Sequence, residues 1–254
     1  MKHVIAIASG KGGVGKTTLT SNLAYCLAEL GNRVLVIDGD FGLRNLDIAL
    51  GLSNNVIYDI ANVIVDEIPV ERAVVELGSS NVFLLAAPQL REHSGVTPFN
   101  LKRFIDSIYA KFDYILIDCP AGIGDNFFIG IYPADLILLI TTPEAASIRD
   151  TDRTAGMLER YGKNDYMLII NRIRADFVKK GKMQNIYEVV DTLGIQALGI
   201  IPESKYITER AKNGKLATEG KKKLIKIPFM NIARRLEGEA VPVIKINKSC
   251  WRNA

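Results

Sequence analysis

The sequence predicts an α/β protein in which helices wrap both faces of a mainly parallel sheet. Seven short apolar runs, rich in valine, isoleucine and leucine, are continuous rather than alternating, as in strands buried on both faces. Helical patterns lie between most of these runs, so strand and helix alternate along the chain. The chain shows no linker, internal repeat or low-complexity stretch. This organisation favours one domain over residues 1–240, followed by a short tail over 241–254.

The boundary residues of the helices support the same reading. The first helix is predicted over Lys16–Leu30, because Gly31 suits the left-handed end of a helix. Thr97 and Pro98 open a helix that continues to about Phe112, since threonine caps helices and proline suits their first turn. Strands are expected at 3–9, 33–38, 82–86, 114–118, 136–141, 166–170 and 197–201, and further helices at 145–161, 183–193, 204–213 and 228–237.

Composition limits the classes of function. The 254 residues are 48% hydrophobic and carry a net charge of +4, which is too weak a bias to indicate nucleic-acid binding. Three widely spaced cysteines favour a reducing compartment over a disulfide framework, and two histidines are too few for a histidine-rich metal site. No apolar run reaches the roughly 18 residues of a membrane span, and we see no targeting segment before the first strand. We therefore expect a cytoplasmic protein, or one peripheral to the inner face of the cell membrane.

A glycine-rich stretch follows the first predicted strand. It matches the phosphate-binding pattern G-x-x-x-x-G-K-[ST] in the strand-to-helix context that the pattern requires. Glycines let backbone N–H groups surround a phosphate, and the following helix adds its positive N-terminal end. We expect Lys16 on the β- and γ-phosphates, Thr17 on Mg²⁺ and Thr18 on the α-phosphate. The expected nucleotide-contacting residues of this loop are Gly10, Lys11, Gly12, Gly13, Val14, Gly15, Lys16, Thr17 and Thr18.

Two other predicted strands end in aspartate, at Asp38 and Asp118. Ligands of open α/β sheets bind beside the carboxyl ends of the strands. Two carboxylates at that edge, next to a phosphate loop, predict magnesium ligands or groups that hold magnesium through water. The predicted metal set is therefore Thr17, Asp38 and Asp118.

The loop contains a second lysine, Lys11, and K-G-G-V-G-K-T-T resembles the deviant Walker A loop of one ATPase superfamily. Members of that superfamily partition plasmids, place division sites or deliver metal clusters. Further motifs narrow the resemblance to its MinD family over residues 1 to about 240, in collinear order. They are IDGDFGLRNLDIALGL (37–52), ILIDCPAGIG (115–124), TTPEAASIRDTDRTAGML (141–158), IINRIR (169–174), GIIPES (199–204) and IARRLEGE (232–239).

The resemblance implies roles for individual residues. Lys11 would cross a dimer interface to the phosphates of the partner's nucleotide, where a second cation offsets transition-state charge. Asp40 would position or activate the attacking water, so the implied catalytic set is Lys11, Lys16 and Asp40. Gly122 would meet the γ-phosphate through its backbone N–H. The adenine would be held by Asn171, Arg172, Pro202 and Glu203, with Asn171 on its edge.

The function implied by the resemblance is a partner-stimulated ATPase that binds Mg-ATP and forms a homodimer in ATP. It would recruit a septum inhibitor and so regulate division-site placement. Arg44 and residues 150–153 would lie near partner surfaces, or form an ordinary charged face. The first alternative is a DNA-partitioning or flagellar-number ATPase, which "GLRNLD", "DCPAGI" and the lack of a basic stripe disfavour. The second is an adaptor that uses ATP only to dimerise, which the retained lysines and aspartates disfavour.

The tail, VPVIKINKSCWRNA, departs from the family pattern. MinD chains usually end in an amphipathic helix that binds anionic lipid on dimerisation. Here Pro242, Val243, Ile244 and Ile246 are poor helix formers in so short a segment. Two interpretations stay open: a frayed tail, and a degenerate membrane-targeting segment. The lysines of 221–226 form either a solvated face or a contact with anionic headgroups. A bacterial cytoplasm and a plastid-encoded copy both fit this chain.

Overall fold

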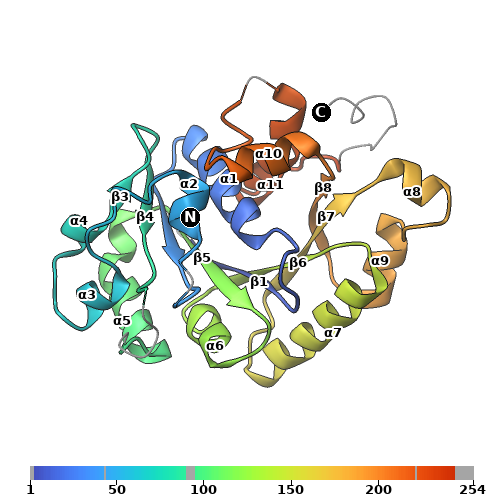
Figure 1. Cartoon of the computed structure of the whole chain (residues 1–254). Helices are drawn as coiled ribbons and strands as arrows, with labels where there is room; N and C mark the ends of the chain where they lie inside the picture. The colour runs from blue at the N-terminus through green and yellow to red at the C-terminus, as the bar shows by residue number, and fades with distance from the viewer. Residues whose placement is uncertain (1–2, 43, 90–94, 221, 244–254) are drawn as a thin grey trace.

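The computed structural model describes residues 3–42, 44–89, 95–220 and 222–243, and within them an eight-stranded sheet in the order β3-β4-β2-β5-β1-β6-β7-β8 (Figure 1). Every neighbouring pair is parallel except β3 and β4. The predicted fold class is confirmed. The strands are β1 (His3–Ser9), β2 (Val34–Asp38), β3 (Val75–Glu76), β4 (Val82–Leu85), β5 (Tyr114–Ala121), β6 (Leu136–Thr141), β7 (Tyr166–Ile173) and β8 (Ala197–Pro202).

Helices cover both faces of this sheet, and two hydrophobic cores lie between the layers. One face carries α1 (Lys16–Glu29), α2 (Leu46–Leu50), α10 (Lys205–Lys212) and α11 (Lys223–Leu236), seen above the sheet in Figure 1. The other face carries α3 (Ile60–Ile64), α4 (Val70–Ala73), α5 (Pro98–Ile108), α6 (Asp125–Ile131), α7 (Ala145–Arg160) and α9 (Ile186–Leu193). A short helix, α8 (Ala175–Lys179), follows β7.

The central strand β1 explains why the apolar runs are continuous. Ile5 and Ile7 point into the core beneath α1, whereas Val4, Ala6 and Ala8 point into the core on the other face. Both sets of side chains are almost fully buried. Successive side chains of a strand point to opposite faces, so a strand covered on both sides needs apolar residues at every position.

The predicted helix boundaries are confirmed where a capping residue marks them. Gly31 follows α1 with a φ of 95°, in the left-handed region. Thr97 and Asn100 form a capping box at the start of α5, with Pro98 in its first turn. Helix α5 is followed by a single 3₁₀ turn, Tyr109–Lys111, which completes the helical stretch predicted to Phe112.

The predicted start of the last helix, at residue 228, is wrong, because α11 begins at Lys223 and contains Pro228 in its interior. A proline inside a helix removes one backbone donor. Ile225, Phe229 and Ile232 on this helix are nevertheless buried in the core beneath α1, and that packing outweighs the lost hydrogen bond.

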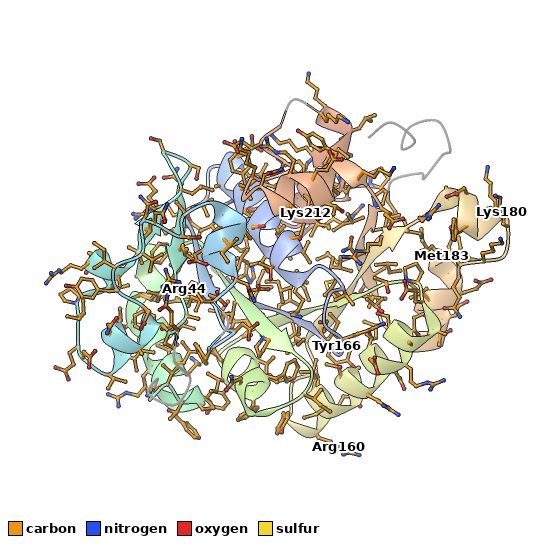
Figure 2. All side chains as sticks on the ribbon, in the orientation of Figure 1. Arg44, Arg160, Tyr166, Lys180, Met183 and Lys212 are labelled. Carbon is orange, nitrogen blue, oxygen red and sulfur yellow. The ribbon has the colours of Figure 1, made fainter. Side chains whose placement is uncertain are left out.

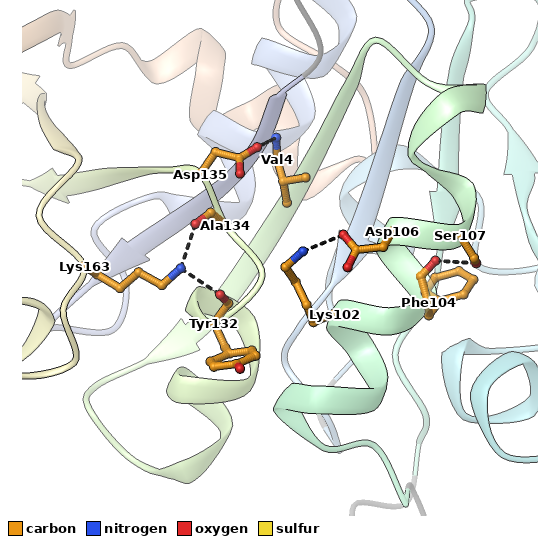
Figure 3. Close-up of polar contacts among 9 residues, drawn as sticks. All are labelled: Val4, Lys102, Phe104, Asp106, Ser107, Tyr132, Ala134, Asp135 and Lys163. Carbon is orange, nitrogen blue, oxygen red and sulfur yellow. Dashed lines mark hydrogen bonds and ion pairs between the residues drawn. The ribbon is translucent and has the colours of Figure 1, made fainter.

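The C-terminal end of α6 is tied to the rest of the molecule by polar contacts (Figure 3). Lys163 donates from Nζ to the carbonyl oxygens of Tyr132 and Ala134, at 2.7 and 2.8 Å. The adjacent Asp135 accepts a hydrogen bond from the backbone N–H of Val4 at 3.0 Å. These contacts fix the turn between α6 and β6 against both β1 and the turn that precedes β7.

Two sequence predictions fall on parts of the chain that the structure does not describe. They concern the tail after Val243, with Ile244, Ile246, Cys250 and Trp251, and Lys221 of the basic run. None of the helices within the described ranges is both long and apolar enough to cross a bilayer.

Candidate nucleotide-binding site

The phosphate loop lies between β1 and α1, at the carboxyl edge of the sheet, and close packing requires glycine at two of its positions. A Cβ on Gly10 would lie 2.3 Å from the backbone oxygen of Asp150 on α7. Gly15 has a φ of 102°, and a Cβ there would lie 2.5 Å from Nδ2 of Asn171. The loop is therefore held between α7 on one side and the end of β7 on the other.

The two lysines of the loop differ in their surroundings. Lys16 is only 9% exposed, and its Nζ donates to the Ser9 hydroxyl at 3.0 Å. Ser9 in turn donates to the backbone oxygen of Lys11 at 2.8 Å. The Lys11 residue itself is exposed. Lys16 is thus positioned inside its own loop, whereas Lys11 is available to a second molecule. The holding role of Ser9 was not predicted.

Asp118, within β5, is a buried carboxylate of the site. Its Oδ2 accepts from the Thr17 hydroxyl at 2.6 Å, and its Oδ1 accepts from the Thr20 hydroxyl at 3.1 Å. Burial raises the pKa of Asp118 to about 7, against the opposing effect of these hydroxyls and of Lys16. The predicted neighbours Thr17 and Asp118 are therefore in direct contact. Thr20 was missed by the sequence analysis.

Asp38 lies beside Asp118 in the parallel pairing of β2 with β5. Both of its oxygens accept backbone N–H groups, from Asp40 to Oδ1 and from Asn45 and Leu46 to Oδ2, each at 3.0 Å. Burial raises the pKa of Asp38 to about 6. In this conformation Asp38 holds the loop between β2 and α2. Its predicted part in holding magnesium stays a prediction.

Asp40 is half-buried at the same edge of the sheet. Burial raises the pKa of its carboxyl, while the charge of Lys16 and a hydrogen bond from the Asn45 side chain act in the opposite direction. Asp40 is therefore near enough to the loop lysine for its charge to be felt. This placement is compatible with the role in handling water that was predicted for it.

The residues present fit magnesium. The ion prefers hard oxygen ligands and usually keeps several waters. Thr17 and Asp118 supply a hydroxyl and a carboxylate that already lie 2.6 Å apart. A donor set of this kind, at the start of a helix and beside a phosphate loop, suits a metal ion that also contacts nucleotide phosphates.

Gly122 follows an irregularity in β5. The pairing of β5 with β1 gains one extra residue between Asp118 and Ala121, and Gly122 has a φ of 86°. Its N–H donates to the backbone oxygen of Ser9 at 3.2 Å. The N–H predicted to meet the γ-phosphate is thus directed at the phosphate loop, and it would have to leave Ser9 to contact a ligand.

A cavity of about 540 Å³ adjoins the loop, in the range typical of small-molecule sites. All four residues predicted to hold the adenine line it, together with Gly15 and Thr18. Much of its remaining wall comes from α10 and α11, including Lys212, which is labelled in Figure 2. Those two helices were predicted as elements, but no motif marked their cavity-lining faces. The lining residues missed by the sequence are Leu19, Ile201, Ser204, Ile207, Thr208, Ala211, Lys212 and Phe229.

A bulge in β7 directs Asn171 toward the loop. The pairing with β8 gains one residue between Ile170 and Ile173, and Arg172 has a φ of 57°. Asn171 donates from Nδ2 to the Val14 backbone oxygen at 2.7 Å and accepts from the N–H of Arg172 at 2.9 Å. Each atom of the amide keeps a second hydrogen-bonding position. Asn171 can therefore stabilise the loop and still contact a base in the cavity.

Comparison with known proteins gives a consistent result. Residues 1–237 match a family model described as "ParA: NUBPL iron-transfer P-loop NTPase". The septum site-determining protein MinD of Synechocystis is 40% identical over 246 residues, covering 96% of this chain and 92% of the relative.

Two solved structures share the whole architecture. MinD in a MinC:MinD cell division protein complex from Aquifex aeolicus is 40% identical, with a TM-score of 0.89, and covers 96% of this chain and 100% of that one. MinD of Pyrococcus horikoshii, complexed with Mg-ADP, is 30% identical, with a TM-score of 0.81, and covers 93% and 96%.

Proposed function

Because the chain belongs to the MinD family of ParA-type P-loop ATPases, we propose that it is the ATPase of a division-site placement system, with Mg-ATP as its substrate. The observation that carries the proposal is the meeting of three parts at one edge of the sheet. These are the phosphate loop with Lys16 inside it, the contact between Thr17 and Asp118, and the cavity lined by Asn171.

We assign the phosphate contacts to the loop. Lys16 would exchange the Ser9 hydroxyl for the β- and γ-phosphates, and Thr18 would contact the α-phosphate. The magnesium held at Thr17 and Asp118 would offset phosphate charge as hydrolysis proceeds. Asp40, half-buried and within the electrostatic influence of Lys16, would orient the attacking water. The base would occupy the cavity beside Asn171, Arg172, Pro202 and Glu203.

Lys11 supports a dimeric active form. Lys11 lies on an exposed stretch of the loop with Gly12 and Gly13, whereas Lys16 is buried. The charge of Lys11 is therefore free to serve a nucleotide held by another copy. Two copies would close on two nucleotides, each supplying Lys11 to the other. Hydrolysis would then follow dimerisation, because the positive charge needed in the transition state comes from the partner.

The protein partners belong to the same proposal. The Aquifex aeolicus relative is described as part of a MinC:MinD complex, and we propose that this chain likewise recruits a septum inhibitor of that kind. A second protein would stimulate hydrolysis. From the sequence alone, we also propose that the tail binds an anionic membrane peripherally. This binding would place the protein at the inner face of the membrane.

The test is to mix two variants that are each expected to be inactive. Lys11→Ala keeps its own Asp40, and Asp40→Ala keeps its own Lys11. In a mixed dimer, Lys11 of the Asp40→Ala subunit would serve the nucleotide of the Lys11→Ala subunit and complete one site. We expect ATP turnover to return to a fraction of the wild-type rate on mixing, measured by phosphate release.

Two controls make the result decisive. Lys16→Ala mixed with Asp40→Ala should stay near the background rate, because Lys16 acts on the nucleotide of its own subunit. Lys11→Ala alone should bind ADP like the wild type. A Lys11→Ala protein that hydrolyses ATP normally would overturn the role in trans, and a wild type that binds ATP without turnover would indicate an adaptor instead.

A further inference from the structure

The Asp118 carboxylate is held by two hydroxyls from one helix. Thr17 donates to Oδ2 and Thr20, one turn further along α1, donates to Oδ1. Thr20 is fully buried and lies 98 residues from Asp118 in the sequence. Nothing in the phosphate-binding pattern requires a hydroxyl at this position, because the pattern ends at Thr17.

Thr20 has one hydroxyl hydrogen and two acceptors within reach. Its Oγ1 lies 3.1 Å from Oδ1 of Asp118 and 3.0 Å from the backbone oxygen of Lys16. A single O–H can make only one strong hydrogen bond at a time. The hydroxyl is therefore divided between its own helix and the carboxylate, while Thr17 makes the shorter contact with Asp118, at 2.6 Å.

The choice of the Thr20 hydroxyl between these two acceptors matters for the magnesium site. Thr17 could give an oxygen lone pair to the metal and still donate its hydrogen to Oδ2 of Asp118. Oδ1 of the carboxylate would then depend on Thr20, the hydroxyl that the structure places on it. A hydrogen bond to a charged acceptor is stronger than one to a neutral carbonyl. The Thr20 hydrogen would therefore favour the ionised Asp118 over the Lys16 carbonyl and hold the carboxylate in its orientation.

We propose that Thr20 is a positioning residue for magnesium, because it holds the second oxygen of the Asp118 carboxylate while Thr17 holds the first. The inference rests on the proposed Mg-nucleotide site and adds to it a residue that neither touches the nucleotide nor binds the ion. Groups that orient metal-holding residues in this way commonly contribute about 10–100-fold to metal affinity.

The experiment measures how far magnesium tightens ADP binding, as the ratio of the dissociation constants in EDTA and in saturating Mg²⁺, by calorimetry. Thr20→Val keeps the shape and removes the hydroxyl, so we expect this ratio to fall about 10-fold. The dissociation constant in EDTA should stay within about twofold of the wild type, because the phosphate loop is intact. Thr20→Ser, which keeps a hydroxyl, should retain a ratio close to the wild-type value.

Thr151→Val is the matched control. Thr151 is also buried, and its hydroxyl donates to the carbonyl one turn earlier, that of Ser147, at 2.9 Å. Like Thr20, Thr151 donates to a backbone carbonyl of its own helix, but within the described residues its hydroxyl makes no hydrogen bond to a carboxylate. We expect an unchanged ratio for this variant. If Thr20→Val does not fold, Thr20→Ala carries the same comparison.

Each contrary outcome has a distinct meaning. An unchanged ratio in Thr20→Val overturns the inference and leaves the proposed function standing. An equal loss of ADP affinity with and without magnesium also overturns it, because Thr20 would then only support the loop. A wild-type protein whose ADP binding ignores magnesium overturns the proposed metal site, and this inference with it.

Discussion

Single residues of the site were predicted where a local pattern fixes both residue type and spacing. The phosphate loop, Asp118 and the four residues predicted to hold the adenine all follow from short motifs, and the structure brings them to one edge of the sheet. Ser9 and Thr20 escaped prediction because their partners are set by the fold. Ser9 meets Lys16 seven residues away across the loop, and Thr20 meets Asp118 from another element.

The buried carboxylate of Asp118 should make the ligand-free protein less stable as pH rises. Its pKa is raised to about 7 from an ordinary 3.8, so the folded state binds this proton more tightly than the unfolded state. The stabilisation from protonation is complete below about pH 4 and is lost as pH rises to about 7. Asp38, with a pKa near 6, acts in the same direction.

Asp118→Asn should remove much of this pH dependence. An asparagine amide can donate to the Thr20 hydroxyl oxygen, whose own hydrogen then serves the Lys16 carbonyl at 3.0 Å. We expect the variant to exceed the wild type in free energy of unfolding at pH 8 by roughly 1–3 kcal/mol, with the gap closing at pH 4. Urea denaturation in EDTA measures this. Parallel profiles for the two proteins would contradict the burial argument.

At the scale of elements, strands were predicted better than helices. A strand buried on both faces leaves an uninterrupted apolar run, which a sequence shows directly. Helices α2, α3, α4, α6 and α8 have four to seven residues each, too few turns to establish a helical period. The edge strand β3 has two residues and gave no pattern at all.

The contacts of Lys163 at the end of α6 should matter for stability. Lys163→Met removes both hydrogen bonds to the Tyr132 and Ala134 carbonyls. At about 0.5–1.5 kcal/mol for each bond, we expect the free energy of unfolding to fall by roughly 1–3 kcal/mol. Lys180→Met is the control, because Lys180 is exposed at the end of α8 (Figure 2). Equal urea midpoints for the two variants would show that the Lys163 contacts contribute nothing.

At the scale of the whole molecule, the strand order makes the nucleotide site depend on distant sequence. The family-model match ends at residue 237, and the last described helix ends at Leu236. The predicted boundary at 240 between domain and tail stays a prediction. Within the sheet, β1 carries the phosphate loop, yet both of its neighbours, β5 and β6, come more than a hundred residues later.

A fragment of residues 1–112 should therefore fail to bind nucleotide, although it contains the entire phosphate loop. It lacks β5 and β6, so β1 has neither pairing partner, and it lacks Asp118 and the cavity wall. We expect no ADP binding by calorimetry at concentrations that saturate residues 1–243, the matched longer chain. Binding by the short fragment within tenfold of the longer chain would contradict this dependence on the sheet.

The central position of β1 also means that this strand is synthesised well before the strands that pair with it. About 110 residues separate Ser9 from its pairing partner Ala121. A ribosome that adds roughly 5–20 residues per second leaves the first strand alone for on the order of 5–20 s. During that interval the nascent chain displays Val4–Ala8, an apolar segment suited to chaperone binding. A translation product abandoned before β5 carries the loop but cannot assemble the site, so incomplete chains do not compete with finished ones for nucleotide.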